Sequence, residues 1–236
     1  MNVPPKPSTY FVTGTDTDAG KTLVTSGLLA LASGQGLTTL GLKPIASGCQ
    51  RTSDGLRNRD AQVLQAYSRP YPAYHTVNPY AFEPAIAPHL AARQAGETVS
   101  LDDLLTTLEQ RPMASHELTL IEGAGGWRVP LNEEDDLADI ARSLQLPVIL
   151  VVGMRLGAIN HARLTAEAIR ADGLTLAGWV ANSMALDFTE RDANVDTLER
   201  HLATPCLGRI PYLGDDADDI ELARRAANYL VLPGSD

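Results

Sequence analysis

Residues 14–22, GTDTDAGKT, nearly match the glycine-rich loop that binds the phosphates of nucleotides. The standard pattern places four residues between its two glycines, followed by Lys and Ser or Thr, but five residues separate Gly14 from Gly20. Two of the five, Asp16 and Asp18, are acidic. Because nearby phosphates repel a carboxylate strongly, we expect at least one of them to point away, towards a cation or solvent. A role for either as an ordinary solvated turn residue stays open.

The segments around this loop favour a nucleotide site. A β-rich run at 9–15 precedes it, and residues 20–33, rich in Leu and Ala, predict a helix after it. N–H groups at a helix N-terminus bind phosphate oxygens. Lys21 and Thr22 carry the groups that phosphoryl transfer uses for charge neutralisation and for Mg²⁺. A glycine-rich turn with an incidental Lys-Thr pair is the alternative. The extra residue lets the loop bulge beyond the nucleotide, which suggests a second, amine-bearing ligand there.

Apolar strands alternate with helices along the chain. This alternation predicts a parallel sheet covered by helices on both faces. We therefore expect one α/β domain over residues 1–236, a three-layer phosphate-loop fold with a mostly parallel central sheet. The further expected strands are 38–46, 117–123, 146–153, 174–182 and 205–213, and the further helices are 59–67, 100–110, 134–144, 157–172 and 219–230. Ser100 has the side chain of a helix cap. The proline-rich segment 69–88 is expected to be functional or poorly ordered.

The composition argues against several classes of protein. The 236 residues carry a formal net charge of -10, which disfavours broad affinity for nucleic acid or anionic lipid. There is no run of about 18 apolar residues, so no membrane span is expected, and the first residues lack the pattern of a secretory signal. Cys49 and Cys206 are the only cysteines, so we expect a cytoplasmic protein without a disulfide framework. The five histidines show no metal-ligand spacing.

Other polar residues suit the same site. Ligands of open α/β sheets bind at the carboxyl ends of the strands. Lys43 would add a second positive charge there, and Glu122, which precedes glycine-rich residues 123–126, suits Mg²⁺ held directly or through water. Asn182 can both donate to and accept from the edge of a purine, although a turn-forming role fits its position equally well. Asp60 is weaker evidence on its own, because Asp is common at helix starts.

These features together resemble the dethiobiotin synthetase family, whose members use ATP near the end of biotin synthesis. The resemblance covers nearly the whole chain and includes the extra loop residue. It rests on YFVTGTDTDAGKT (10–22), GLKPIASG (41–48), GLRNRDA (55–61), TVNPYAFEPAIAPH (76–89), IEGAGGWRVPL (121–131), LPVILVVGMRLGAINHA (146–162) and LTLAGWVAN (174–182). Several such blocks in one order are far more specific than a phosphate loop alone.

The resemblance implies a reaction in which 7,8-diaminononanoate, CO2 and ATP give dethiobiotin, ADP and phosphate. One amine captures CO2 as a carbamate, the carbamate takes the γ-phosphoryl group, and the second amine closes a cyclic urea as phosphate leaves. The protein would act mainly by positioning and charge stabilisation. Mg²⁺ would accompany ATP, and a homodimer would complete each substrate site across its interface.

The resemblance also implies roles for individual residues. Lys21, Lys43 and Thr17 would be catalytic, and Thr22, Asp60 and Glu122 would surround Mg²⁺. The ATP site would comprise Asp18, Ala19, Gly20, Lys21, Thr22, Leu23, Asp60, Glu122, Gly123, Ala124, Gly125, Asn182, Ser183, Pro211, Tyr212 and Leu213. The diamine or its carbamate would contact Thr17, Asp18 and Ser47, and its carboxylate would meet Gly157 and Asn160 across the dimer interface.

Two positions depart from the family pattern, and other functions stay open. Asp18 stands where Glu is expected, and Asn194 stands about where some members carry a substrate-facing aromatic. The main alternative is a regulatory or partitioning ATPase of the related deviant phosphate-loop group, which typically has a lysine at the place of Asp16. An amide-forming ligase would need a glutamine-cleaving domain as well. A non-catalytic nucleotide-binding homologue would not need every charged residue that is present.

Overall fold

Six parallel strands form the central sheet of the computed structural model, which describes residues 8–214 and 216–234. Their spatial order is β10-β9-β8-β1-β7-β2, and each neighbouring pair is parallel. The strands are β1 (Ser8–Gly14), β2 (Thr39–Leu42), β7 (Leu118–Glu122), β8 (Val148–Met154), β9 (Leu176–Ser183) and β10 (Cys206–Ile210). The predicted α/β class with a mostly parallel sheet is confirmed.

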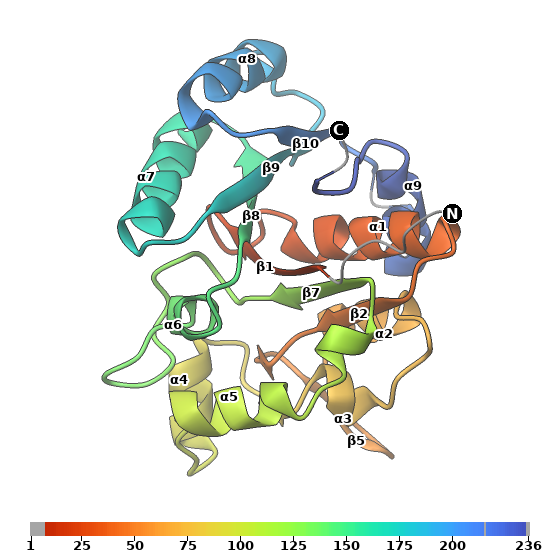
Figure 1. The fold of residues 1–236 in the computed structure, drawn as a ribbon, viewed down its shortest axis with the longest axis vertical. Coiled ribbons are helices and arrows are strands. Elements are labelled where there is room, and N and C mark those ends of the chain that lie inside the picture. Colours follow the sequence, from red (N-terminus) through yellow and green to blue (C-terminus); the bar gives the residue numbers. More distant parts are fainter. Residues whose placement is uncertain (1–7, 215, 235–236) are drawn as a thin grey trace.

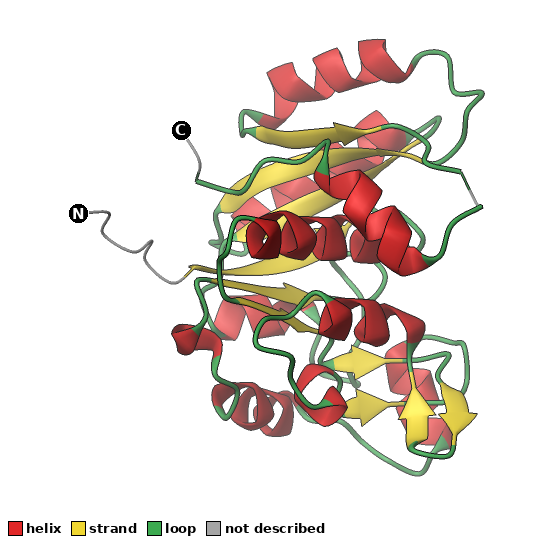
Figure 2. Ribbon diagram, turned by 90° about the vertical axis from the view of Figure 1, so that its right-hand side faces the viewer, coloured by secondary structure: helices red, strands yellow, loops and turns green. Residues whose placement is uncertain are grey.

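The two faces of the sheet pack into separate cores. Phe11 and Val12, neighbours in β1, enter different cores, and so do Leu150 and Val151 in β8, as the two-residue period of a strand requires. One core includes residues of α1 (Lys21–Gly34), α2 (Arg59–Ala66), α3 (Tyr74–Val77) and α9 (Asp219–Ala227). The other includes residues of α4 (Pro88–Gln94), α5 (Leu101–Glu109), α6 (Ala138–Ser143), α7 (Ala158–Ala171) and α8 (Arg191–Leu202). Figures 1 and 2 show the resulting three layers.

Side-chain caps define where several helices begin. The Ser100 hydroxyl accepts a hydrogen bond from the Asp103 N–H at 3.0 Å, so α5 starts where the sequence predicts. The Asn58 side chain accepts from the Ala61 N–H at 3.1 Å and starts α2. Such caps satisfy N–H groups that a helix leaves without partners at its first turn. The cap of α2 matters for function because it determines where Asp60 lies.

The predicted strand 38–46 is wrong as a single element. β2 ends at Leu42, and β3 (Ile45–Ala46) pairs with β6 (Tyr80–Ala81) in a separate two-stranded sheet. Pro44 has no N–H to donate to a strand ladder, so the chain leaves the central sheet at this point. Lys43 therefore lies in the gap between the two strands, one residue beyond β2.

Three other predicted boundaries also need correction. The predicted helix 134–144 begins only at Ala138, because the Asn132 side chain accepts from two following N–H groups at 2.8 Å and forms a local turn instead. The strand predicted at 205–213 ends at Ile210, before Pro211. The last helix, predicted for 219–230, ends at Ala227.

Several short elements have no counterpart in the predictions. The proline-rich segment 69–88 contains α3 and β6, and a hairpin of β4 (Gln50–Thr52) and β5 (Gly55–Arg57) lies before it. The structure also has α4, α8 and the single-turn helix η1 (Met113–Ser115), which the predictions lack. Within residues 8–214 and 216–234, no helix is both long and apolar enough to cross a bilayer.

The sheet order brings distant parts of the chain to one edge. β1 lies between β8 and β7, and β2 pairs with the far side of β7. Because all six strands are parallel, the segments that follow β1, β2, β7, β8, β9 and β10 leave from the same edge. Open α/β sheets bind their ligands at this carboxyl edge. Lys43, Glu122 and Asn182 all lie there or one residue beyond it.

Candidate functional site

The loop between β1 and α1 is bent by two residues with left-handed backbone. Asp18 has φ 61° and Gly20 has φ 91°, a region that favours glycine. A Cβ on Gly20 would lie only 2.0 Å from the side-chain nitrogen of Asn182, so glycine is needed there for space as well as for conformation. Thr17 and Asp18 are exposed at the top of the loop. The loop thus presents its predicted substrate-facing residues outward.

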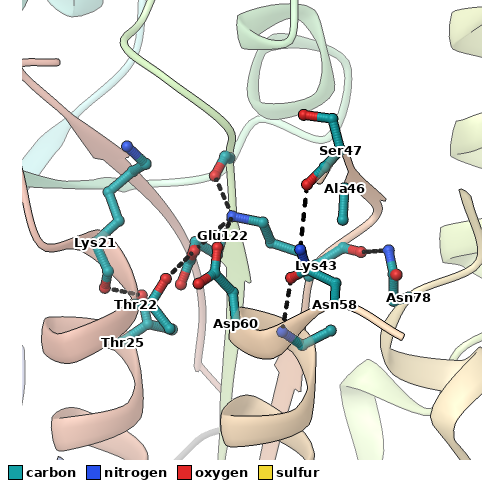
Figure 3. Close-up of polar contacts among 12 residues, drawn as sticks. Lys21, Thr22, Thr25, Lys43, Ala46, Ser47, Asn58, Asp60, Asn78 and Glu122 are labelled. Atoms are coloured by element: carbon teal, nitrogen blue, oxygen red, sulfur yellow. Dashed lines mark hydrogen bonds and ion pairs between the residues drawn. The ribbon is translucent and has the colours of Figure 1, made fainter. Parts of the chain in front are cut away.

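The side chains predicted for phosphate and magnesium chemistry form one polar cluster. The buried Lys43 ammonium donates to Glu122 Oε1 at 2.6 Å and to the Gly123 carbonyl at 3.2 Å. It also lies 3.2 Å from Asp60 Oδ2. Thr22 Oγ1 donates to the same Glu122 oxygen at 2.8 Å. Figure 3 shows Lys43 reaching between the two carboxylates, with Thr22 on the other side of Glu122.

Glu122 has one oxygen left to bind a further group. The residue is 1% exposed, and its Oε2 atom has no hydrogen-bond partner. Leaving a buried carboxylate oxygen without a partner is costly, so a bound cation would relieve this cost. Among the described residues, no three His, Cys, Asp or Glu side chains gather as a metal site. Mg²⁺ commonly takes only one or two carboxylates and fills its other positions with waters and phosphates, so Thr22, Asp60 and Glu122 fit it.

Lys21 and Lys43 lie close enough to influence each other electrostatically. Burial, followed by the charge of Lys43, lowers the pKa of Lys21 to about 8. For Lys43 burial also opposes the charged form, but Glu122 and Asp60 outweigh burial and raise its pKa. The Lys21 ammonium donates to the Asp16 carbonyl at 3.0 Å. Lys43 is therefore already neutralised by acids, whereas Lys21 has no carboxylate at hydrogen-bond distance in the described structure.

The glycine-rich loop after β7 lies against the nucleotide loop. A Cβ on Gly123 would meet the Phe11 ring at 3.0 Å, and one on Gly126 would be 3.7 Å from the Gly14 carbonyl. Gly125 has φ 64°, and a Cβ there would lie 3.6 Å from Thr17 Oγ1. Ala124 is partly buried against the neighbouring core. Close backbone approach between the two loops explains why this segment contains glycines.

A third group of predicted residues lies at the ends of β9 and β10. The buried Asn182 side chain donates to the Ala19 carbonyl at 3.0 Å, while its oxygen has no partner. Ser183 is also buried, and its hydroxyl has no partner. Asn182 pairs in register with Ile210, so the partly buried segment 211–213 leaves the sheet beside it. The predicted adenine-contacting residues therefore come together at this part of the edge.

Two cavities show where a ligand has room. A cavity of about 220 Å³ is lined in part by Thr22, Leu23 and Asp60, which links three predicted ATP-site residues to one space. A larger cavity, of about 630 Å³, lies against α4, the start of α5 and residues 131–135. None of the predicted site residues lines the larger cavity. The chemistry of the polar cluster, and not cavity size, therefore locates the candidate site.

The two loop acids have different surroundings. Asp16 forms an ion pair with Arg155, which follows β8. Asp18 is exposed and faces solvent at the top of the loop. The expectation that at least one acid points to a cation or solvent agrees with both positions. Arg155, which the sequence predictions lack, is the cation for Asp16, and Asp18 remains available for a ligand.

Other predicted substrate-site residues are less closely tied to the cluster. Ser47 is partly buried, and its carbonyl accepts from the Asn58 side chain at 3.3 Å. Gly157, with φ 93°, and Asn160 are exposed at the start of α7. Asn194 lies on α8, where its amide donates to the Glu190 carbonyl at 2.7 Å. A single chain therefore does not enclose the predicted carboxylate site.

Two buried asparagines support the cluster and are absent from the sequence predictions. The Asn78 amide donates to the Lys43 carbonyl at 2.8 Å. Asn58 joins the start of α2, which carries Asp60, to the Ser47 carbonyl (Figure 3). Both lie inside segments that resemble the dethiobiotin synthetase family, but as isolated residues they look like common turn or cap residues.

The sequence of this chain is similar to known proteins over most of its length. A family described as an AAA domain matches residues 8–218. The ATP-dependent dethiobiotin synthetase BioD of Chromohalobacter salexigens is 62% identical, over 96% of this chain and 99% of that protein. The protein of the same name from Cellvibrio japonicus is 56% identical, over 86% of this chain and 89% of its own length. The chain belongs to the ATP-dependent dethiobiotin synthetase family.

More distant likenesses show only the fold. A ParA family ATPase of Chlorobium tepidum superposes with a TM-score of 0.55 at 11% identity, covering 95% of this chain and all 100% of that one. The cell division ATPase MinD of Pyrococcus furiosus gives a TM-score of 0.53 at 15% identity, covering 94% of this chain and 97% of its own. The dethiobiotin synthetase family thus shares its architecture with these ATPases, and the sequence relatives distinguish it from them.

Proposed function

We propose that this chain is an ATP-dependent dethiobiotin synthase that converts 7,8-diaminononanoate, CO2 and ATP into dethiobiotin, ADP and phosphate. Family membership supports the reaction, and the cluster of Lys21, Thr22, Lys43 and Glu122 beside the nucleotide loop is the structural observation that carries it. Two ammonium groups and a carboxylate suit a reaction in which a carbamate oxygen attacks a phosphoryl group. Such transfers depend mainly on positioning and on stabilising negative charge.

The proposed reaction has three steps. One amine attacks CO2, loses a proton and becomes a carbamate. A carbamate oxygen attacks the γ-phosphorus, the bond to the bridging oxygen breaks, and ADP leaves. The second amine then attacks the carbonyl carbon of the mixed anhydride, loses a proton and expels phosphate as the cyclic urea forms. Lys43 and Lys21 stabilise the negative oxygens in these steps, and Thr17 orients the carbamate.

The residues around the phosphates suit magnesium. Thr22, Asp60 and Glu122 would hold the ion, with the unpartnered Oε2 of Glu122 as the oxygen most in need of it. Bound Mg²⁺ would neutralise charge that develops on the phosphate oxygens. Lys43 would then exchange its contacts with Glu122 and Asp60 for contacts with the transferred group. The exchange keeps the ammonium in the cluster and turns it from a structural cation into a catalytic one.

The base and substrate contacts follow from what the side chains leave free. Asn182 uses its nitrogen on Ala19, so its oxygen is free to accept from the amino group of adenine. Residues 211–213 would form the further wall of the adenine pocket, with Ser183 beside them. Thr17, Asp18 and Ser47 would face the diamine. Since Asp16 is paired with Arg155, we assign the amine contact to Asp18.

We also propose a homodimer that acts in the cytoplasm on small molecules. Gly157 and Asn160 are exposed at the N-terminus of α7, where N–H groups suit a carboxylate. Leu156, beside them, is 93% exposed. A second copy covering this surface would both bury the leucine and supply the carboxylate contact.

The direct test is an assay with ATP, Mg²⁺, bicarbonate and 7,8-diaminononanoate, followed by mass detection of the cyclic urea. We expect dethiobiotin and ADP in equal amounts, and none when the diamine is omitted. ATP hydrolysis that depends on DNA or lipid, without any dethiobiotin, would instead support a regulatory or partitioning ATPase and reject this proposal.

A further inference from the structure

An aspartate at the end of α7 fastens the loop that follows β7. Asp172 accepts from the indole N–H of Trp127 at 2.8 Å through one carboxylate oxygen and from Arg128 at 2.7 Å through the other. Trp127 is 4% exposed, and the Asp172 side chain is 10% exposed. Neither residue belongs to the site proposed above. The contact joins residues that are 45 positions apart in the chain.

Trp127 is connected to the candidate site through the short segment 123–126. The Gly123 carbonyl accepts from Lys43 at 3.2 Å, and the Gly123 N–H donates to the Val12 carbonyl at 3.0 Å. Gly126 lies against the carbonyls of Gly14 and Thr15. A displacement of Trp127 would therefore move atoms that touch both Lys43 and the nucleotide loop.

The ring of Trp127 is held in the core as well. Its centroid lies 6.0 Å from that of Phe11, with the two planes at 80°. Phe11 in turn lies directly under Gly123. Packing alone would allow the ring to shift within its apolar surroundings. The hydrogen bond to Asp172 fixes the orientation of the ring. An indole N–H can only donate, and a buried one without an acceptor is costly.

The carboxylate itself is well suited to this contact. Burial opposes its charged form, but the hydrogen bonds from Arg128 and Trp127 outweigh burial and hold the pKa of Asp172 below its usual range. Arg128 is about half exposed and also lies 3.9 Å from Asp136. Solvent therefore screens the attraction between Arg128 and Asp172. The partly buried hydrogen bond from Trp127, less open to solvent than the one from Arg128, is therefore the part that constrains the loop.

We propose that Asp172 is a positioning residue for the phosphoryl-transfer site, acting through Trp127 on the 123–126 segment. The inference rests on the proposed function for its kinetic readout. Asp172 touches no predicted ligand; it limits where the Gly123 carbonyl, and with it the Lys43 ammonium, can lie. Misplacement of a catalytic group by about 1 Å can cost about a hundredfold in rate, so a modest loosening is enough to be measured.

The test compares Asp172→Ala, Trp127→Phe and the double variant with two milder changes. Asp172→Ala removes the acceptor, and Trp127→Phe removes the donor but keeps a ring in the core. We expect each to lower kcat about tenfold, with KM for ATP changed about twofold or less, and the double variant to be no worse than either single one. Asp172→Asn keeps an acceptor for the indole and should recover most of the activity. Arg128→Ala should have an effect of about threefold or less.

The matched control is Glu199→Ala, which breaks an exposed ion pair with Arg209 on α8 and β10 and should leave kcat unchanged. Hydrogen exchange of residues 123–127 gives a readout that does not depend on the reaction. We expect faster exchange there in Asp172→Ala and Trp127→Phe, and wild-type exchange in Glu199→Ala.

The outcomes separate this inference from the proposed function. A lower melting temperature for Asp172→Ala, with wild-type kcat at 25 °C and wild-type exchange in 123–127, would show a structural role only and overturn the inference. If the wild-type chain forms no dethiobiotin, the proposed function fails, and the exchange data still decide whether Asp172 constrains the loop. Unchanged exchange overturns the inference in either case.

Discussion

At the scale of single residues, the two lysines of the site differ in how their charge is compensated. Lys43 lies between Glu122 and Asp60, whereas Lys21 contacts a backbone carbonyl. Their pKa values accordingly move in opposite directions. The difference suggests separate tasks. Lys21 can bind the negative charge of phosphates directly, whereas Lys43 must first break its ion pairs with Glu122 and Asp60.

Lys43→Ala should abolish turnover while ATP still binds. The variant removes the ammonium that would stabilise the transferring group, and charge stabilisation of this kind typically contributes about a hundredfold or more to the rate. The nucleotide loop and Lys21 remain to hold ATP. Dethiobiotin formation and calorimetric ATP binding measure the two effects. Full activity in this variant would remove Lys43 from the mechanism. Because Glu122 and Asp60 lose their cation in this variant, circular dichroism should be used to check that the variant is folded.

Nucleotide binding should take up a proton in mildly alkaline solution. The pKa of Lys21 is lowered to about 8 without ligand, and phosphates placed beside it would raise that pKa. Lys21 is then mostly neutral at about pH 9 before binding and charged after it, but charged in both states at about pH 6.5. Calorimetry of ADP binding in buffers of different ionisation enthalpy measures the uptake.

The control for this measurement is Lys21→Arg, since arginine stays protonated throughout this range. Proton uptake at about pH 9 should disappear in that variant, provided that it still binds ADP. Phosphate monoesters lose their second proton near pH 6, so the nucleotide itself contributes little at about pH 9. Equal uptake by wild type and Lys21→Arg would assign the proton to another group.

At the scale of elements, the start of α1 is built against the end of β9. Gly20 is the residue just before α1 and Asn182 is the last but one residue of β9, and the two lie so close that a Cβ on Gly20 would be 2.0 Å from the Asn182 side-chain nitrogen. The contact places the predicted adenine residue next to the predicted phosphate loop. The contact joins two elements more than 150 residues apart in the chain. Because it is so close, even the smallest added side chain would disturb it.

Gly20→Ala should destabilise the fold by more than the cost of its backbone conformation alone. A left-handed residue other than glycine costs about 1–2 kcal/mol, and the new Cβ would also lie 2.0 Å from the Asn182 side-chain nitrogen. Urea unfolding measures the free energy of unfolding. Adding Asn182→Ala should restore part of the loss by removing the steric clash. If Gly20→Ala alone is as stable as wild type, the contact is not as close as described.

The elements that the sequence predicts well are those with a strong local signal. Strand β1, helices α1, α5 and α7, and the apolar strands β7, β8 and β9 lie within two residues of their expected bounds. Their signals are apolar runs, caps such as Ser100, and glycine stops. The short pair β3 and β6 is different, because each has two residues and is stabilised by distant parts of the chain. Pro44 shows the limit of propensity: the run 38–46 has the β-prone residues of a single strand, yet one missing N–H divides it.

At the scale of the whole molecule, one chain leaves part of the proposed site open. Lys43 and Glu122 are buried and Thr22 is partly buried within one chain, but Gly157 and Asn160 are exposed. Near them Leu156 is 93% exposed, and Leu164 of α7 is 56% exposed. Contiguous exposed apolar side chains often mark an interaction surface, and both of these leucines belong to α7 or the loop that leads into it. The proposed dimer would use this surface to complete the substrate site.

Leu156→Asp should therefore weaken dimerisation and raise KM for the diamine more than KM for ATP. The carboxylate contact depends on the second copy, whereas the nucleotide site does not. Sedimentation velocity measures the oligomeric state, and steady-state kinetics with each substrate varied measure the two KM values. We expect KM for the diamine to rise about tenfold or more, in proportion to a lost contact worth about 1.4 kcal/mol or more.

Val231→Asp is the matched control, since Val231 is 52% exposed near the end of the chain and away from α7. It should leave both the oligomeric state and the kinetics unchanged. A wild-type chain that sediments as a monomer with full activity would rule out the proposed dimer. Equal effects of the two substitutions would mean that this surface is not specific.

The sequence also predicts the site unevenly. Motif spacing identifies Lys21 and Thr22 without knowledge of the fold, because the whole motif lies in one continuous stretch, residues 14–22. Glu122 and Lys43 follow from their places after strands. Arg155, Asn58, Asn78 and Asp172 could not be found in this way, because each acts on a residue far along the chain, and none has a distinctive local pattern. Tertiary contact, and not residue type, gives them their roles.

The position of Lys43 between the two acids also affects how the chain folds in the absence of ligands. A newly made chain encounters magnesium and nucleotide only by diffusion, but Lys43 arrives with the polypeptide. By balancing Glu122 and Asp60, it lets the interior close before any ligand is present. The proposed Mg²⁺ would then enter an already folded protein and take the place of a charge that the chain itself holds there. Removal of divalent ions by a chelator should accordingly stop dethiobiotin formation and leave the melting temperature nearly unchanged.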